Sequence, residues 1–229
     1  MTPIDKLTRK YKFNPSNFDT AKDNYYTFCM TINNPNYSIE KSEEAYKALY
    51  ESFVQILDIA ASESQIRENL SLYTPTLHDI PISVTIATDT SDINITMVLF
   101  QNFYVATAIK SPQNIKFMKD EFWSLLFQLS AVGTFRFKEK ELPDKTMRKK
   151  HPQLFNKTGN YYKFLRNYFL FEANYGRIRD LGSIAVSWES TESFDVLIPK
   201  ICDAVKIMYR LNFLLWKHDN KNVRLNHRF

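Results

Sequence analysis

Basic residues gather in one stretch of the chain, from Arg136 to Lys150. Seven lysines and arginines against three acidic residues give this stretch a net charge of +4, in a chain of 229 residues whose formal net charge is +5. A concentrated positive segment attracts phosphate, an anionic membrane surface or an acidic protein face. We interpret the stretch as a contact segment, and its candidate partner-binding residues are Lys138, Lys145, Arg148, Lys149 and Lys150.

A plain solvated connector is the alternative interpretation of this segment. Lys138-Glu139-Lys140-Glu141 alternates in sign, which dilutes the positive patch. Tyr161 and Tyr162 follow the segment, but their spacing fits a buried helix face better than a platform on which bases stack.

A second group of charges lies further along the chain, where a helix is expected to give way to a strand. Arg177 and Arg179 stand between Glu172 and Asp180. A loop of this composition can present an acid together with cationic partners, since loops on a rigid scaffold often carry function. We add Arg177 and Arg179 to the candidate partner-binding residues, with mutually paired surface charges as the alternative.

The residue types that support catalysis or metal binding are present without the required spacing. Four histidines and two cysteines form no metal-binding motif, so we predict no metal site. Asp219-Asn220-Lys221 matches half of a metal-dependent nuclease signature, but it follows a helix in a polar tail. The pairs Arg210 with His218 and Arg224 with His227 miss the arrangement that would grip a phosphate and move a proton. We therefore predict no catalytic residue and favour a non-enzymatic protein.

Glycine and cysteine usage narrows the function further. No two of the four glycines lie close enough to form a glycine-rich phosphate loop, which argues against a nucleotide-binding fold and leaves no predicted cofactor. Cys29 and Cys202 are isolated, and we expect both to be buried free thiols. The sequence starts without a secretory signal pattern and contains no apolar run of about 18 residues, so we expect a cytoplasmic protein without a transmembrane segment.

Hydrophobic periodicity predicts the elements that position these residues. Alternating aromatic and polar side chains indicate a strand from Tyr25 to Ile32. Ser42 is the expected cap of a helix that continues to Ala60, and an extra helical turn is expected between Gln65 and Leu70. Three further strands, which read as an antiparallel meander, are expected at 82–88, 93–100 and 103–109.

The second half of the chain ends in a long helical stripe from Phe194 to Leu215. At about 1.5 Å per residue this helix would reach roughly 30 Å, and Pro199 is expected to kink it or to mark its start. The other elements predicted in this half are helices at 111–131 and 160–172 and strands at 134–138 and 184–188.

These elements predict an α+β fold with a mainly antiparallel sheet and several packed helices, including the long C-terminal one. We expect residues 1–229 to form a single domain, with the 139–159 connector as the only acceptable boundary.

Two functions remain compatible with the sequence. The absence of every tested catalytic and cofactor motif favours a non-enzymatic cytoplasmic protein-interaction module, either a toxin-neutralising immunity protein or an adaptor that binds one protein partner. The net positive charge and the basic connector favour a nucleic-acid-binding or nucleic-acid-processing protein as the alternative. The oligomeric state is not indicated.

Overall fold

The computed structural model describes residues 1–29, 38–73, 81–138, 163, 165–167, 169–170 and 181–226, without the side chains of residues 28, 29, 138 and 219–226. In chain order its elements are the helices α1 (Pro3–Tyr11), α2 (Pro15–Cys29) and α3 (Ile39–Glu63), the strands β1 (Leu70–Tyr73), β2 (Ile82–Thr88), β3 (Asn94–Leu99) and β4 (Asn102–Ala108), the 3-10 helix η1 (Pro112–Phe117), the helix α4 (Asp120–Val132), the strands β5 (Thr134–Lys138) and β6 (Ser183–Glu189), and the helix α7 (Phe194–Asn226).

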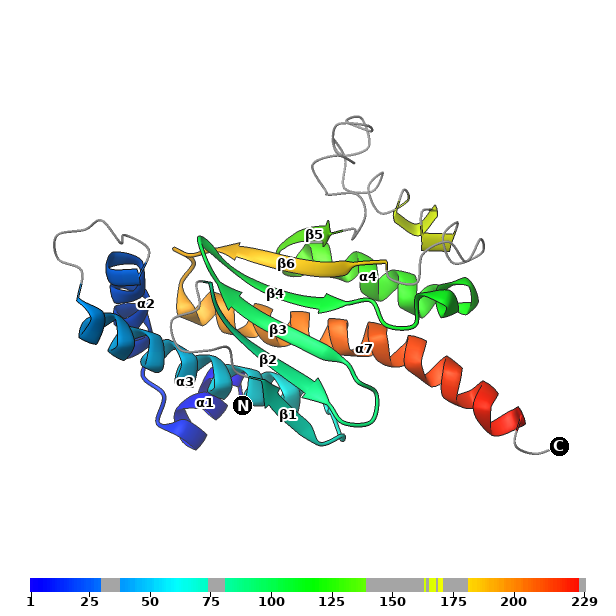
Figure 1. The fold of residues 1–229 in the computed structure, drawn as a ribbon, viewed down its shortest axis with the longest axis horizontal. Helices are drawn as coiled ribbons and strands as arrows, with labels where there is room; N and C mark the ends of the chain where they lie inside the picture. The colour runs from blue at the N-terminus through cyan, green and yellow to red at the C-terminus, as the bar shows by residue number, and fades with distance from the viewer. Residues whose placement is uncertain are drawn as a thin grey trace.

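The strands form one sheet in the order β1-β2-β3-β4-β6-β5, and each neighbouring pair is antiparallel. The long helix α7 runs beneath the sheet and extends past it towards the C-terminus (Figure 1). This arrangement confirms the predicted α+β fold with a mainly antiparallel sheet and a long C-terminal helix. Whether the whole chain is one domain stays a prediction, because the 139–159 connector lies outside the described residues.

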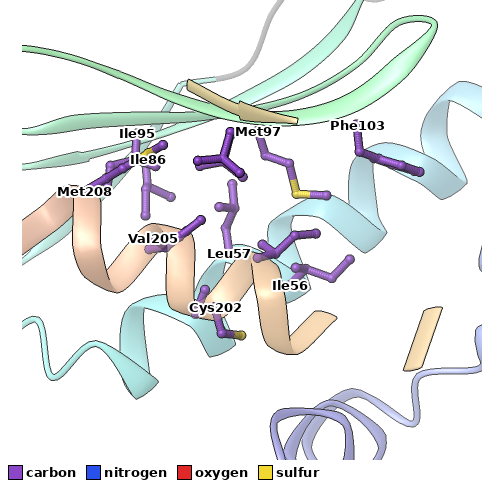
Figure 2. Close-up of a cluster of buried hydrophobic side chains, with 14 of the residues drawn as sticks. Ile56, Leu57, Ile86, Ile95, Met97, Phe103, Cys202, Val205 and Met208 are labelled. Carbon is purple, nitrogen blue, oxygen red and sulfur yellow. The ribbon is translucent and has the colours of Figure 1, made fainter. Parts of the chain in front are cut away.

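The hydrophobic core lies between the sheet and the helices α3 and α7. Figure 2 shows side chains of the strands pointing towards both helices, where they meet Leu57 of α3 and Val205 of α7. Ile86, Met97 and Phe103 are all at most 4% exposed. At about 1.5–3 kcal/mol for each large apolar side chain removed from water, this layer is the main source of stability.

The opposite face of the sheet, which we call the open face, carries small and polar side chains. In β2, Ile82, Val84 and Ile86 are buried towards the helices, whereas Ser83 and Thr85 alternate with them on the open face. The same alternation continues through β4 and through the first four residues of β3 and of β6, after which Val98 and Ser187 are also buried on the open face.

The edge strand β5 pairs with β6 although residues 139–182 separate them in the sequence. The register places Lys138 opposite Ser183 and Thr134 opposite Ser187. Residues 163, 165–167 and 169–170 are helical, which agrees with the predicted helix at 160–172 where it is described. Phe169 packs edge-on against Phe137 of β5 with ring centroids 5.1 Å apart.

The prediction of a strand from Tyr25 was wrong, because residues up to Cys29 belong to helix α2. Pro15 suits the first turn of this helix, and the Asn14 side chain accepts a hydrogen bond from the Ser16 amide at 3.0 Å. Phe18 and Tyr25, seven residues apart, are at most 2% exposed, so packing outweighed the local alternation. Residues 30–32 lie outside the described residues.

Other element boundaries also differ from the prediction. Helix α3 begins after Ser38, whose hydroxyl accepts from the Lys41 amide, and Ser42 is inside the helix. Residues 65–69 form no helix, and Leu70 already belongs to β1. The helix expected at 111–131 is divided into η1 and α4 by the extended backbone of Met118 and Lys119. Helix α7 starts at Phe194 and contains Pro199.

Candidate functional site

Most of the basic residues chosen from the sequence lie outside the described residues. Lys138 is the last residue of β5, where its backbone alone is described. The other six candidate partner-binding residues fall in undescribed segments: Lys145, Arg148, Lys149, Lys150, Arg177 and Arg179. Whether these residues form one contact surface therefore stays a prediction.

Neither arginine–histidine pair considered in the sequence forms a site among the described residues. Arg210 and His218 contact different partners, and the Arg224 side chain and residue 227 are not described. Arg210 pairs with Glu121, whereas the His218 ring stacks on Phe117 with centroids 4.4 Å apart. Residues 219–221 belong to the last turns of α7 instead of a polar tail, and their side chains are not described.

A groove lies between α4 and α7, and we call it the α4–α7 groove. Its volume is about 810 Å³, within the range of roughly 300–1,000 Å³ that is typical of ligand-binding clefts. Helix α4 forms one wall, α7 forms the floor, and the segment that follows α3 forms the opposite wall. The side chains that line the groove include Arg67, Glu68, Glu121, Leu125, Gln128, Asp203, Lys206, Tyr209, Arg210, Phe213 and Trp216.

Three aromatic rings of α7 form the floor of the groove. The Tyr209 and Phe213 rings are stacked with centroids 5.6 Å apart, and the Phe213 and Trp216 rings are tilted with centroids 5.3 Å apart. Spacings of three and four residues place these rings on one side of the helix. Leu125 of α4 adds aliphatic surface, so the floor offers apolar contact area to a ligand.

Glu68 closes one end of the groove and is held by three hydrogen bonds. Its carboxylate accepts from the Ser91 amide at 2.7 Å, from the Ser91 hydroxyl at 2.8 Å and from the Tyr209 hydroxyl at 2.9 Å. Burial, together with this hydrogen bond and the nearby Glu68 charge, raises the pKa of Tyr209. The Tyr209 hydroxyl therefore stays protonated at neutral pH, and its proton is committed to Glu68.

An ion pair joins the two helices across the groove. Arg210 of α7 donates from Nε and Nη2 to one carboxylate oxygen of Glu121 on α4, at 3.0 and 2.8 Å. Both side chains are about half exposed, so a partner that covers them would strengthen their attraction by excluding water. Glu68, Glu121 and Asp203 balance Arg67, Lys206 and Arg210, so the groove has no net charge.

The groove lining offers carboxylates, basic side chains and aromatic rings as contact groups. Among the described residues of the lining there is no histidine and no cysteine, and the protonated Tyr209 hydroxyl is a poor nucleophile. In the described part of the chain, no three histidine, cysteine, aspartate or glutamate side chains are grouped as metal ligands. No helix there combines the length and the apolar character needed to cross a membrane.

Comparisons with known proteins give no family and no relative: no family model, no curated protein and no solved structure matches this chain. Function is therefore inferred from the residues and their arrangement.

The sequence analysis missed the groove because its walls come from distant segments. Glu68 and Tyr209 are 141 residues apart in the chain. One signal was available: Tyr209, Phe213 and Trp216 form an aromatic stripe beside the buried stripe that includes Met208, Leu211 and Leu215. A helix that buries one stripe and carries a second aromatic stripe beside it has surface left for another contact.

Proposed function

We propose that this protein is a protein-interaction module that binds its partner through the α4–α7 groove. The observation that carries the proposal is the combination of an aromatic floor with a charged rim. Tyrosine, tryptophan and arginine dominate binding energy at protein interfaces. Within one side of α7, the groove presents Tyr209, Arg210 and Trp216.

The balance of charges supports a polypeptide as the ligand. A small anionic or cationic ligand is favoured by a site of opposite sign, whereas this rim carries three acids and three bases. A segment of a protein can present apolar side chains to the floor and both signs of charge to the rim. A partner segment with mixed charge therefore fits the groove best.

Two roles follow from such binding. The protein would neutralise its partner, as a toxin-neutralising immunity protein does, or connect it to another component as an adaptor. Both roles are non-enzymatic, and we propose that the protein carries out its role in the cytoplasm. The identity of the partner distinguishes them.

Photo-crosslinking from inside and outside the groove tests the proposal. A photoreactive phenylalanine derivative is placed at Gln128, which lines the groove, or at its neighbour Phe127, which is 52% exposed and does not line it. We expect the full-length protein in its native cells to crosslink one partner from position 128 and little from position 127. Equal crosslinking from both positions, or none, would contradict the proposal.

A matched pair of truncations then measures the contribution of the floor. Phe213→Ala removes a ring from the groove, and Phe127→Ala removes an exposed ring from α4. Because a truncated central aromatic residue typically costs at least about 2 kcal/mol, we expect Phe213→Ala to weaken binding of the identified partner by about 30-fold. Thermal unfolding of both variants separates this effect from loss of the fold, and equal affinities would count against the groove.

Nucleic-acid binding through the basic connector remains the second proposal. The balanced charge of the groove gives it no support, and the connector residues beyond Lys138 lie outside the described residues. Affinity for RNA or DNA that falls steeply as salt is added would favour it. Failure to bind either nucleic acid at low salt would exclude it.

A further inference from the structure

A second depression lies on the open face of the sheet, over β4, β6 and β5. We call it the sheet hollow, and its volume is about 400 Å³. Its described lining comes from all three strands and from the β3–β4 turn, and no aspartate or glutamate is found among these described residues. It is separate from the α4–α7 groove, which lies on the helical side of the protein.

The strand register explains why the face is hollow at this point. Ala106 of β4 is paired with Ala185 of β6, and Ala185 is paired in turn with Arg136 of β5. Paired residues share a face, so two alanines and one arginine form a row across three strands. Alanine side chains end at Cβ, and the floor of the hollow is low between the taller side chains around it.

Tyr104 and Arg136 stand at opposite sides of this floor. Tyr104 precedes Ala106 by two residues on β4 and pairs with Ser187 of β6. At a strand spacing of about 4.8 Å, β4 and β5 lie roughly 10 Å apart across β6. This separation lets the two long side chains reach one ligand that rests on the alanines.

Arg136 is the cation that lines this hollow, and it has no acidic partner among the described residues. Its side chain is exposed, and it makes no ion pair within the described part of the chain. Some described lysines and arginines are paired with carboxylates, such as Lys110 with Asp92 and Arg210 with Glu121, whereas Arg9 and Arg67 resemble Arg136 in having no ion pair with a described residue. An uncompensated guanidinium beside an acid-free hollow favours an anion there.

The neutral polar groups around the hollow also favour an anion. Burial raises the pKa of Tyr104, so its hydroxyl keeps its proton, and no described residue accepts that proton. Asn102, Ser183 and Ser187 add an amide and two hydroxyls to the lining. The Ser187 hydroxyl donates only a long hydrogen bond of 3.4 Å to the Thr134 carbonyl. These donors suit an oxygen-rich ligand.

We propose that the sheet hollow binds the phosphate group of a small organic phosphate, with Arg136 supplying the charge and Tyr104 a neutral hydroxyl donor. A guanidinium pairs with two phosphate oxygens through parallel hydrogen bonds, and the hydroxyl donates to a third. A volume of about 400 Å³ leaves space for an organic group beside the phosphate. This site does not depend on the function proposed for the α4–α7 groove.

Titration of the full chain, followed by amide NMR signals, tests the site. The probes are inorganic phosphate and adenosine monophosphate, with sodium acetate and a single-stranded RNA as comparisons at constant ionic strength. We expect both phosphates to shift the signals of Ala106 and Ala185, with acetate much weaker. Shifts centred elsewhere, acetate equal to phosphate, or a response to RNA without a response to either small phosphate would overturn the proposal.

Two variants and one control assign the effect to the hollow. Arg136→Gln should weaken binding of adenosine monophosphate at least about tenfold, because it removes a charged hydrogen-bond donor. Arg9→Gln removes the same charge from the exposed face of α1 and should leave affinity unchanged. Ala185→Leu should block binding by filling the floor without changing charge. Equal losses in the two arginine variants, or full binding by a folded Ala185→Leu protein, would refute the site.

Discussion

Asn212 is a buried polar residue of α7 whose replacement by alanine should destabilise the fold strongly. Its side chain is 1% exposed. The side-chain oxygen accepts from the Lys110 amide at 2.9 Å, and the side-chain nitrogen donates to the Thr107 hydroxyl at 2.9 Å. Thr107 in turn donates to the Asn94 carbonyl at 2.7 Å. Asn212 therefore ties α7 to the sheet and to the chain that leaves β4.

The cost of Asn212→Ala follows from these partners. The Lys110 amide would lose its acceptor, which costs about 1–3 kcal/mol for a buried donor. Thr107 keeps its bond to Asn94, so the loss on that side is smaller. The space left by the amide group adds roughly 1 kcal/mol, since the surroundings close only in part. We expect a total of about 2–4 kcal/mol, or a fall in Tm of roughly 5–15 °C for a chain of this size.

Thermal and urea unfolding of the full chain measure this effect. The control is Asn17→Ala, which replaces an exposed asparagine in helix α2 and should change stability by less than about 0.5 kcal/mol. A loss for Asn212→Ala within that same range would refute the reasoning, because the network would then contribute nothing measurable.

Two further predictions concern the packing of a glycine and a thiol. A Cβ at Gly133 would lie 2.6 Å from Trp188 Nε1 and 2.7 Å from Val186 Cγ1, so Gly133→Ala should lower the unfolding free energy by about 1–3 kcal/mol, and an unchanged urea midpoint would contradict this. Burial raises the pKa of the Cys202 thiol to about 12 from an ordinary value of 9.0. The neutral thiol contributes its full stability below pH 9 and loses it as the pH rises towards 12. The unfolding free energy should therefore fall more steeply with pH in the unmodified protein than in Cys202→Ala, and equal slopes would exclude the effect.

The parts of the fold that sequence patterns predicted well are those in which local alternation and burial agree. The bounds of β2 and β5 match the predicted strands, since each strand has one buried side and turn residues or a glycine beside it. Helix α2 was missed because residues 25–29 alternate like a strand, whereas Tyr25 is buried in a helix that packs against α3. Such tertiary contacts cannot be read from a short window of sequence.

The two candidate sites were harder to predict from sequence than the helices and strands, because both depend on tertiary contacts. The positive charge of the 136–150 segment is visible in the sequence, but the alanine floor beside Arg136 depends on the register of three strands. The α4–α7 groove depends on helices that are far apart in the chain. Residue types alone indicated the positively charged segment. The side chains that surround Arg136 became visible only in the fold.

The pairing of Lys138 with Ser183 also determines where the chain tolerates changes in length. Because Lys138 and Ser183 are paired, the two ends of the excursion from residue 139 to residue 182 are held at neighbouring positions of the sheet. The entropy cost of closing such an excursion grows with the logarithm of its length, by about 0.6 kcal/mol for each doubling. Insertions that spare the buried Leu165 and Phe169 should therefore leave the sheet intact. Lengthening this excursion away from Leu165 and Phe169 should therefore cost little folding free energy.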